Sequence, residues 1–458
     1  MSGELKANFE KLADMQYADG SFPWFKGMPG NRYITQQIVL NLAQLKYLKM
    51  IDEKSFPEVN TLLNKAIIYL DHQLVKDFSS DSHYTGAYST PMHYLYARSY
   101  TNQINNNELF NTAIKQALAS ITNDWAKMST YEQGLAALVL HRNGKQEEAM
   151  KIVNSLKDRS QQKEEIGMYW PDNNVGSWWY QSPVETQALL IEVFDEVAND
   201  ITSVEEMKIW LLKNKQNNSW KTTKATTAAC YALLMRGYNL LEESKEPEIT
   251  LGGKTLSELG LSEPITEAGT GYRKIEIEGK AVKSDMGTVT VKNNNKGIAW
   301  GGLYWQYFEQ ADKITSAASG IIIKKELFLQ SSTPSGMILT SLKKGNALKK
   351  GDLLKVRIEI RCDQPMEYLH LKDMRSAGFE PTNVISTYKY QDGLGYFEST
   401  KDASTNFFID YMPKGVYIFE YPLRVNSSGN FSNGVTSLQS MYAPEYTTHS
   451  EGTRVSVK

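Results

Sequence analysis

Residues 19–35 read D-G-S-F-P-W-F-K-G-M-P-G-N-R-Y-I-T, and residues 36–48 continue as Q-Q-I-V-L-N-L-A-Q-L-K-Y-L. A loop of Gly, Pro and aromatic residues thus leads directly into a helix that carries Thr near its start and apolar residues at helical spacing. Such a leading loop suits three roles: a catalytic loop, an aromatic platform for sugars, or a set of turns that joins two helices. Its recurrence along the chain distinguishes between them.

The leading loop recurs before residue 245. The stretch N-N-S-W-K-T-T-K-A-T-T-A-A-C-Y-A-L-L (217–234) repeats its order of polar turn, aromatic residue, Thr-rich start and small-residue helix, and residues 168–190 hold a longer copy. Weaker copies occupy residues 84–96 and 125–140. We align the copies on Thr35, Met92, Gln133, Thr186 and Thr226. Successive copies are then 40 to 57 residues apart, which is the length of one helical hairpin.

An amphipathic segment lies between each pair of copies, at residues 64–76, 108–121, 146–157 and 204–213. Alternation of apolar and amphipathic helices fits a closed ring, in which inner helices are buried on most sides and outer helices keep one solvated face. We therefore predict an α/α toroid over residues 1–245. The leading loop then supplies turns at Gly20, Gly27 and Gly30 and caps the ring with Phe22 and Trp24.

After residue 245 the pattern changes to apolar alternation of period two, which predicts strands. Gly, Asn, Ser and Pro clusters separate these segments, as in an antiparallel β-sandwich. The stretch E-E-S-K-E-P-E-I-T-L-G-G-K (242–254) is the expected linker. The predicted strands lie at residues 273–282, 287–292, 352–361, 406–411 and 416–425.

The bulk composition excludes several classes of function. The 458 residues, 41% of them hydrophobic and 22% charged, suit two or three globular domains. A net charge of −2 with both signs mixed gives no electrostatic footprint for nucleic acid. No apolar run is long enough to span a bilayer. The start, M-S-G-E-L-K, lacks a signal-peptide pattern and resembles the middle of a helix, so we expect this chain to be a piece of a longer protein.

Candidate reactive residues are few. His83 and His93 lie near one leading loop and could act as bases, whereas His72 and His141 fit structural roles. Glu132, Asp172 and Glu185 lie near the loops, but no spacing selects a catalytic pair. Seven of the nine tryptophans lie in the predicted toroid: Trp24, Trp125, Trp170, Trp178, Trp179, Trp210 and Trp220. Their side chains could stack on sugars, but their spread around the ring favours a role in plugging it.

The two cysteines, Cys230 and Cys362, fall in different predicted domains and form neither a disulfide framework nor a CxxC zinc pair. Cys230 lies within the apolar run A-A-C-Y-A-L-L, which predicts a small hydrophobic residue packed in the core. We predict no catalytic residue, no metal site and no cofactor in this chain, and its binding residues stay unknown.

Several stretches resemble bacterial alpha-2-macroglobulins, particularly the Bacteroidetes type. They are D-G-S-F-P-W-F with N-R-Y-I-T-Q-Q-I, and K-N-N-N-K-G-I-A-W-G-G-L-Y-W-Q-Y-F-E-Q (292–310), which is similar to the family's return into CUB-like strands. L-K-D-M-R-S-A-G-F-E-P-T-N (371–383) resembles a family turn, with Arg375-Ser376 where Pro is common, and S-M-Y-A-P-E-Y (440–446) resembles the last strand. The resemblance implies a thioester-domain-like toroid over residues 1–245, a CUB-like segment over 246–318 and a macroglobulin-like sandwich over 319–458.

The resemblance also implies a function. The family consists of endopeptidase inhibitors that trap proteases, many through an internal Cys-x-Glu-Gln thioester, which implies target proteases as partners and a periplasmic or cell-envelope location. This chain has no such motif, because Cys230 and Cys362 lack the following Glu-Gln. Thr130-Tyr131-Glu132-Gln133 carries Thr in place of Cys and is interpreted as coincidence. The alternatives are a polysaccharide lyase or glycoside hydrolase, and a purely structural surface module.

Overall fold

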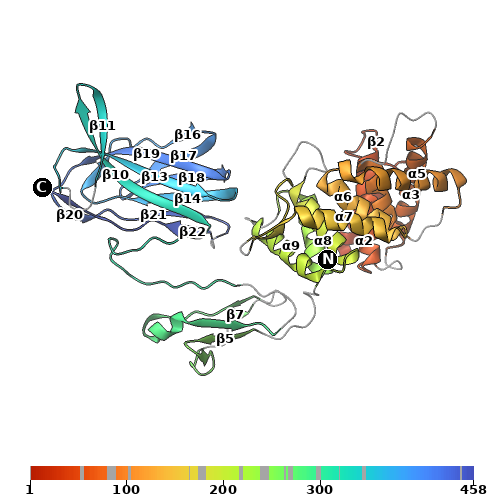
Figure 1. Ribbon diagram of the computed structural model, residues 1–458, viewed down its shortest axis with the longest axis horizontal. Coiled ribbons are helices and arrows are strands. Elements are labelled where there is room, and N and C mark those ends of the chain that lie inside the picture. Colours follow the sequence, from red (N-terminus) through yellow and green to blue (C-terminus); the bar gives the residue numbers. More distant parts are fainter. Residues whose placement is uncertain are drawn as a thin grey trace. The chain divides into compact units, whose positions relative to one another are not determined.

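The computed structural model describes residues 2–51, 56–79, 89–101, 105–163, 166–173, 182–215, 220–237, 247–261, 265–266, 272–294, 301–318, 320–342, 347–443 and 446–458. The chain divides into two compact units. One comprises Met1–Asn214 with Trp220–Ala299, and the other comprises Lys215–Ser219 with Trp300–Lys458. Helices dominate the first unit and a β-sandwich the second (Figure 1).

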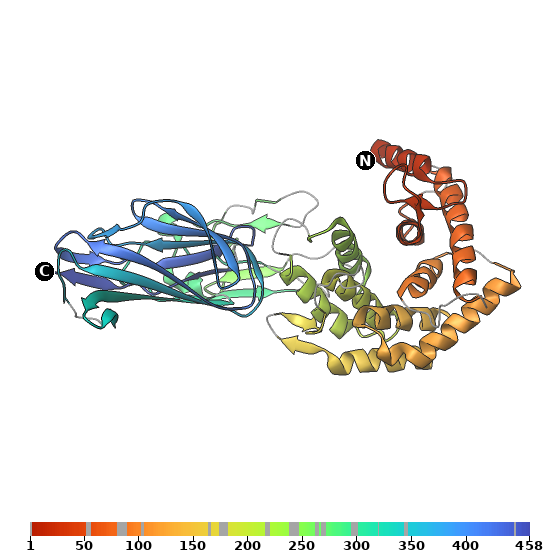
Figure 2. The ribbon, with the colours of Figure 1, turned by 90° about the horizontal axis from the view of Figure 1, so that it is seen from above.

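The helices form two alternating classes, as predicted. Each inner helix contacts the next inner helix along the chain, and the series curves through space as an arc (Figure 2). The inner helices are α2 (Arg32–Tyr47), α4 (Ser89–Arg98), α6 (Thr130–Arg142), α8 (Pro183–Glu196) and α10 (Thr223–Met235). The outer helices are α1 (Ser2–Met15), α3 (Pro57–Asp77), α5 (Glu108–Asp124), α7 (Gln146–Arg159) and α9 (Ile201–Lys213).

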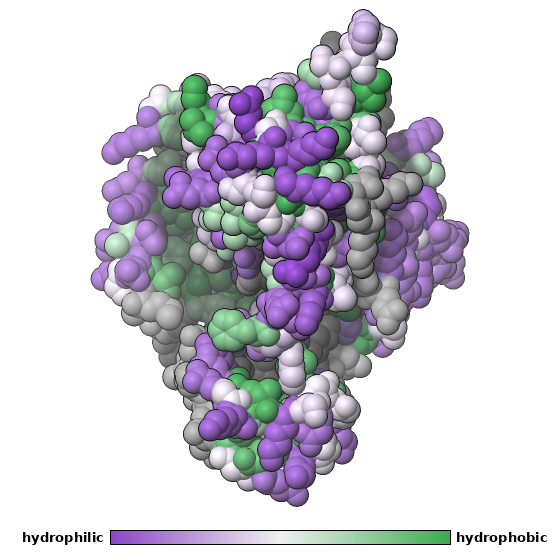
Figure 3. Space-filling model, turned by 90° about the vertical axis from the view of Figure 1, so that its left-hand side faces the viewer, coloured by the Kyte–Doolittle hydropathy of each residue, from purple (hydrophilic) through white to green (hydrophobic). Residues whose placement is uncertain are grey.

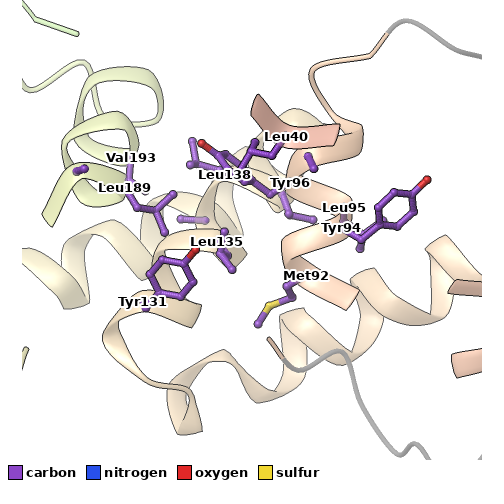
Figure 4. Close-up of a cluster of buried hydrophobic side chains, with 14 of the residues drawn as sticks. Leu40, Met92, Tyr94, Leu95, Tyr96, Tyr131, Leu135, Leu138, Leu189 and Val193 are labelled. Carbon is purple, nitrogen blue, oxygen red and sulfur yellow. The ribbon is translucent and has the colours of Figure 1, made fainter. Parts of the chain in front are cut away.

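Burial explains the two classes. In α6 almost every side chain from Thr130 to Leu140 is buried, and Ser129 and Glu132 cap its start with a reciprocal capping box. In α7 only one stripe is buried, formed by Ala149, Ile152, Val153 and Leu156. Leucine, methionine and tyrosine side chains of the inner helices fill the space between them (Figure 4). The α/α toroid of helical hairpins is therefore confirmed as the architecture of this part.

Short strands and turns join the helices. The strands β1 (Phe22–Pro23) and β2 (Gly30–Asn31) pair within the first leading loop, and β3 (Gln161–Lys163) pairs with β4 (Gly167–Tyr169) before the fourth inner helix. A 3₁₀ turn, η1 (Trp125–Lys127), precedes α6. Among the described residues, no helix is long and apolar enough to cross a membrane.

A small β region follows the helices. Strands β5 (Glu248–Leu251), β6 (Lys254–Thr255) and β9 (Val289–Lys292) form an antiparallel sheet, so the predicted linker 242–254 contains strand. The predicted strand 273–282 was wrong beyond its start. Among the described residues, β8 (Arg273–Lys274) pairs only with β7 (Ile265–Thr266), and the 3₁₀ turns η2 (Gly279–Ala281) and η3 (Ser284–Gly287) follow. Apolar alternation favours a strand, but a strand also needs a neighbour to pair with.

The second unit is an antiparallel sandwich with its own core, and the predicted strands 352–361, 406–411 and 416–425 are confirmed within it. One sheet has the order β11-β10-β13-β19-β15 and the other β16-β17-β18-β14-β21-β22. The strands are β10 (Ile321–Thr333), β11 (Gly336–Ser341), β13 (Leu353–Cys362), β14 (Met366–Met374), β15 (Phe379–Pro381), β16 (Thr387–Gln391), β17 (Leu394–Thr400), β18 (Ser404–Met412), β19 (Gly415–Val425), β21 (Thr436–Ser440) and β22 (Thr447–His449).

A third, smaller sheet closes one end of the sandwich with the order β12-β23-β20, formed by β12 (Ala347–Leu348), β23 (Arg454–Val457) and β20 (Gly429–Ser432). The stretch 440–446 therefore does not contain the last strand, because β22 and β23 follow it. Residues 301–310, which the resemblance assigns to CUB-like strands, form no strand here. Viewed toward the end that carries the C-terminus, the surface is largely hydrophilic with smaller hydrophobic groups (Figure 3).

The segment that enters the sandwich lies along its edge strand β22. The amide of Ala317 donates to the carbonyl of His449 at 3.1 Å, and the amide of His449 donates back to Ala317 at 3.0 Å. The amide of Gly452 donates to the carbonyl of Ile314 at 2.8 Å. A Cβ at Gly452 would overlap the carbonyl oxygen of Ala311, so only glycine permits this approach.

Candidate functional site

The leading loop of α2 is fastened to that helix by its Thr. The amide of Phe22 donates to Oγ1 of Thr35 at 2.9 Å, and the Phe22 ring is only 1% exposed. Gly20 has a φ of +92°, and a Cβ there would overlap the carbonyl oxygen of Lys65 in α3. The predicted capping role of Phe22 is confirmed, whereas Trp24 is 51% exposed and does not plug the ring.

A related hydrogen bond, in which the Thr hydroxyl donates instead of accepting, holds the aromatic residue at α10. Oγ1 of Thr226 donates to the carbonyl of Trp220 at 3.0 Å, and Trp220 is 6% exposed with its indole N–H bonded to the Leu211 carbonyl. Trp170, 2% exposed, likewise donates to the carbonyl of Leu156. These aromatic residues are core plugs, as favoured from the sequence; Trp125 and Trp210 pack against the core, and Trp178 and Trp179 lie outside the described residues.

A mixed polar and aromatic cluster lies near the starts of the five inner helices, and we call it the N-terminal cluster. It consists of Tyr33, His93, Tyr131, Glu185 and Lys224, one from each of α2, α4, α6, α8 and α10. The Lys224 ammonium lies 4.0 Å from the Glu185 carboxylate and 6.0 Å from the centre of the Tyr33 ring. The first turn of the last inner helix therefore approaches the first turn of α2.

Burial governs the protonation of this cluster. It lowers the pKa of His93 to about 3, and the positive charge of Lys224 adds to the effect. Burial raises the pKa of Tyr33 to about 12, with a further contribution from the Glu185 carboxylate. The Lys224 pKa is lowered by burial, which the Glu185 charge opposes. His93 is thus a neutral ring at pH 7, 1% exposed, with Nδ1 placed 3.2 Å from Nε2 of Gln36.

Charged and tyrosine side chains cluster near the opposite ends of four of these helices, α4, α6, α8 and α10. We call this set, Tyr96, Tyr100, Arg142, Glu192, Glu196, Tyr231 and Arg236, the C-terminal cluster. Nη2 of Arg142 lies 2.5 Å from Oε1 of Glu192, and Nη2 of Arg236 lies 2.9 Å from the same oxygen. Nε of Arg142 lies 2.7 Å from Glu196, and the Tyr96 hydroxyl donates to Glu192 at 2.7 Å. The cluster therefore joins α4, α6, α8 and α10.

The charges in the C-terminal cluster compensate one another. Burial alone would lower the pKa of Arg142, but the hydrogen bond to Glu196 and the charge of Glu192 outweigh it and raise that pKa. Burial would raise the pKa of Glu196, but Arg142 and Arg236 outweigh it and lower that pKa. Sequence reasoning missed this cluster, because its residues are distant in the chain and follow no motif. The one signal present was a carboxylate, Glu192, inside the apolar run A-L-L-I-E-V-F (188–194).

The other candidate residues have structural contacts. Glu132 accepts from Ser129 in the capping box, and the hydroxyl of Thr130 donates to Asp172 at 3.3 Å. The side-chain amide nitrogen of Gln133 donates to the Met128 carbonyl at 3.0 Å, and the Arg159 guanidinium donates to the side-chain oxygen of Gln133. The Thr-Tyr-Glu-Gln stretch is thus held by unrelated partners. His83 lies outside the described residues, and within them no group of three or more His, Cys, Asp or Glu could hold a metal ion.

The prediction for Cys230 was wrong. Cys230 is exposed, because α10 buries only the stripe formed by Ala225, Ala229, Ala232 and Leu233. An apolar run shows that a helix packs against others, but it does not show how many of its faces are covered. Cys362, in contrast, is buried at the end of β13, and burial raises its pKa.

Comparison with known proteins confirms the resemblance. Residues 320–445 match the family model of the bacterial alpha-2-macroglobulin MG10 domain, which covers most of the sandwich. The chain is 24% identical over 330 residues, 66% of its length, to an alpha-2-macroglobulin homolog from Nostoc sp.. The chain is therefore similar to bacterial alpha-2-macroglobulins. It spans only 16% of the Nostoc relative, and the Bacteroidetes type stays a prediction.

Solved structures show weaker likeness. Trypsin-activated alpha-2-macroglobulin from Escherichia coli is 12% identical, with 98% of this chain and 29% of that chain covered and a TM-score of 0.43. Native Escherichia coli alpha-2-macroglobulin from domain MG7 to the C-terminus is 11% identical, with 100% of this chain and 68% of that chain covered and a TM-score of 0.34.

Proposed function

We propose that this chain is the C-terminal part of an alpha-2-macroglobulin-like endopeptidase inhibitor, a protease trap, and that it performs no catalysis itself. The observation that carries the proposal is the match of residues 320–445 to the bacterial MG10 domain, placed after a ring of helical hairpins. Target proteases are the proposed partners, reached through the whole protein, and the periplasm or cell envelope is the proposed location. The proposed division is a toroid over 1–245, a CUB-like segment over 246–318 and a macroglobulin-like sandwich over 319–458.

The contacts of the candidate residues support a structural role for this chain. Glu132, Asp172 and Glu185 are engaged with Ser129, Thr130 and Lys224, and their contacts select no pair for acid–base hydrolysis. The Cys-x-Glu-Gln sequence that a thioester needs is absent from these 458 residues. The lyase or hydrolase alternative is therefore not favoured by any described contact.

The proposal is tested with the full-length protein and trypsin, a protease that activates the Escherichia coli relative. A trapped protease is excluded from large substrates but keeps an accessible active site. We expect trypsin to lose activity on casein while it still hydrolyses a small peptide amide. Unchanged hydrolysis of casein at a molar excess of the full-length protein would reject the proposal.

A further inference from the structure

A lysine and an aspartate meet inside the sandwich, at positions where both strands otherwise place apolar side chains. Lys325 lies in β10 between Ile323 and Leu327, which are buried. Asp373 lies in β14, two positions after the buried Leu371. Nζ of Lys325 lies 2.7 Å from Oδ1 of Asp373, and the two side chains are 5% and 0% exposed. Because β10 and β14 belong to different sheets, this pair joins the two layers of the sandwich.

The surroundings of the Lys325 amine direct it toward the carboxyl group. Nζ also donates to the carbonyl of Met374 at 2.7 Å and to the carbonyl of Asn433 at 3.2 Å. A neutral amine has two N–H bonds and one lone pair, so donation to these two carbonyls leaves the lone pair directed at Asp373. Two opposite charges are costly in an interior of low dielectric, which favours passage of one ammonium proton to the carboxylate. An amine and a carboxylic acid then face each other at reacting distance.

Hydroxyl groups hold both oxygens of the Asp373 carboxyl group. The Thr436 hydroxyl of β21 donates to Oδ1 at 2.5 Å, and the Tyr421 hydroxyl of β19 donates to Oδ2. Burial, together with the negative charge of Asp373, raises the pKa of Tyr421 well above its usual value, so this phenol keeps its proton. The donor at Oδ1 polarises the carbonyl group, and the donor at Oδ2 can supply a proton to an oxygen that departs.

We propose that Lys325 and Asp373 condense to an isopeptide bond that braces the two sheets covalently, a modification that goes beyond the protease-trap function. Nζ forms a bond to Cγ of Asp373, and the bond between Cγ and Oδ2 breaks. Oδ2 takes two of the three protons of the original ammonium group and departs as water. The third proton stays on the amide nitrogen, so the atoms balance and the step needs no further reactant. Burial protects the product, because the site excludes the water that would hydrolyse it.

The test is mass spectrometry of the full-length protein after denaturation and digestion with trypsin. Trypsin does not cleave after an acylated lysine, so we expect residues 325–343 to remain joined to residues 373–375. The mass of the joined peptide should be lower than the sum of its two parts by one water molecule. Fragmentation of the joined peptide locates the bond and distinguishes it from loss of water within either part. Release of residues 326–343 alone, without a joined peptide, shows that the pair stays ionic and overturns the proposal.

Two variants assign the bond to one amine. Lys325→Arg keeps the positive charge and the tryptic site but removes the amine, so the joined peptide should disappear. Lys324→Arg is the matched control, because the Lys324 side chain is 64% exposed on the same strand, and the joined peptide should persist. A joined peptide in Lys325→Arg, or its loss in Lys324→Arg, would contradict the assignment, and circular dichroism verifies the fold of each variant. Peptide masses and casein hydrolysis are separate measurements, so this proposal and the protease trap can fail independently.

Discussion

The guanidinium of Arg142 lies 2.5 Å from the carboxylate of Glu192, and this pair joins two neighbouring inner helices, α6 and α8. Glu192 is 1% exposed and also accepts from Arg236 and Tyr96, so its charge is fully engaged. Breaking one partner of a buried pair leaves the other charge uncompensated, which costs more than the pair itself contributes.

The first prediction follows from that relationship. Glu192→Gln keeps the size of the side chain but leaves Arg142 and Arg236 with less negative charge, and should lower the free energy of unfolding by about 3–5 kcal/mol. Urea titration followed by far-UV circular dichroism measures this free energy, because the helices that give the signal belong to the same unit as Glu192. The control Asp124→Asn removes the exposed pair of Lys127 and Asp124 and should cost less than about 1 kcal/mol. Equal losses in the two variants would contradict the prediction.

The second prediction concerns pH and His93. Its folded pKa is lowered to about 3, below an unfolded value of about 6.5, so unfolding takes up a proton throughout that window. The contribution of His93 to stability is therefore complete above pH 6.5 and falls by about 1.4 kcal/mol per pH unit below it. Chemical denaturation between about pH 5 and 7 should show this slope, and His93→Gln should flatten it. The exposed His72→Gln variant is the control and should keep the slope. If the slope persists in His93→Gln but disappears in His72→Gln, the pH dependence comes from His72 and the prediction is wrong.

The third prediction separates backbone strain from a steric clash. Gly20 and Gly27 share a φ of +92°, but only at Gly20 would a Cβ overlap another atom, the carbonyl oxygen of Lys65. Gly27→Ala should therefore cost about 1–2 kcal/mol, the penalty for a Cβ in this region of φ. Gly20→Ala should cost clearly more, because α3 must also shift. Thermal unfolding of the two variants makes the comparison, and a larger effect at Gly27 would show that the leading loop is not packed against α3 as described.

The fourth prediction concerns the thiols. Cys230 is exposed, while Cys362 is buried and has a raised pKa, so the folded chain should react with iodoacetamide at one cysteine. Mass spectrometry should show rapid modification at Cys230 and modification of Cys362 only after denaturation. Cys230→Ser should remove the rapid phase. Prompt labelling of Cys362 in the native protein would contradict the burial of β13.

The sequence predicted the secondary structure correctly where a residue pattern has a single physical cause. Recurring small-residue and amphipathic helices predicted the hairpins, because the two patterns reflect different numbers of covered faces. The strands β13 and β19 were predicted closely, because both alternate over ten or more residues and both pair along their length. The resemblance carried by residues 371–383 was also confirmed, through the MG10 match over 320–445.

The remainder depended on contacts that are distant in sequence. Cys230 was misplaced because the neighbours of α10, and not its composition, decide which side is exposed. The C-terminal cluster joins Tyr96 to Glu192 across 96 positions, and no local pattern reports such a pairing. His93 was seen as a possible base, but only its burial and its contact with Gln36 show a neutral structural ring. The boundaries at 245 and 318 stay predictions.

The fastening of Thr35 to Phe22 and of Thr226 to Trp220 has a consequence for the history of this fold. Each of these two hairpins carries its plug and the hydroxyl that holds it within a few residues of its own inner helix. A duplicated hairpin would therefore arrive with its own attachment and would need only a compatible neighbour. Growth by whole hairpins then requires no coordinated change elsewhere in the helical unit.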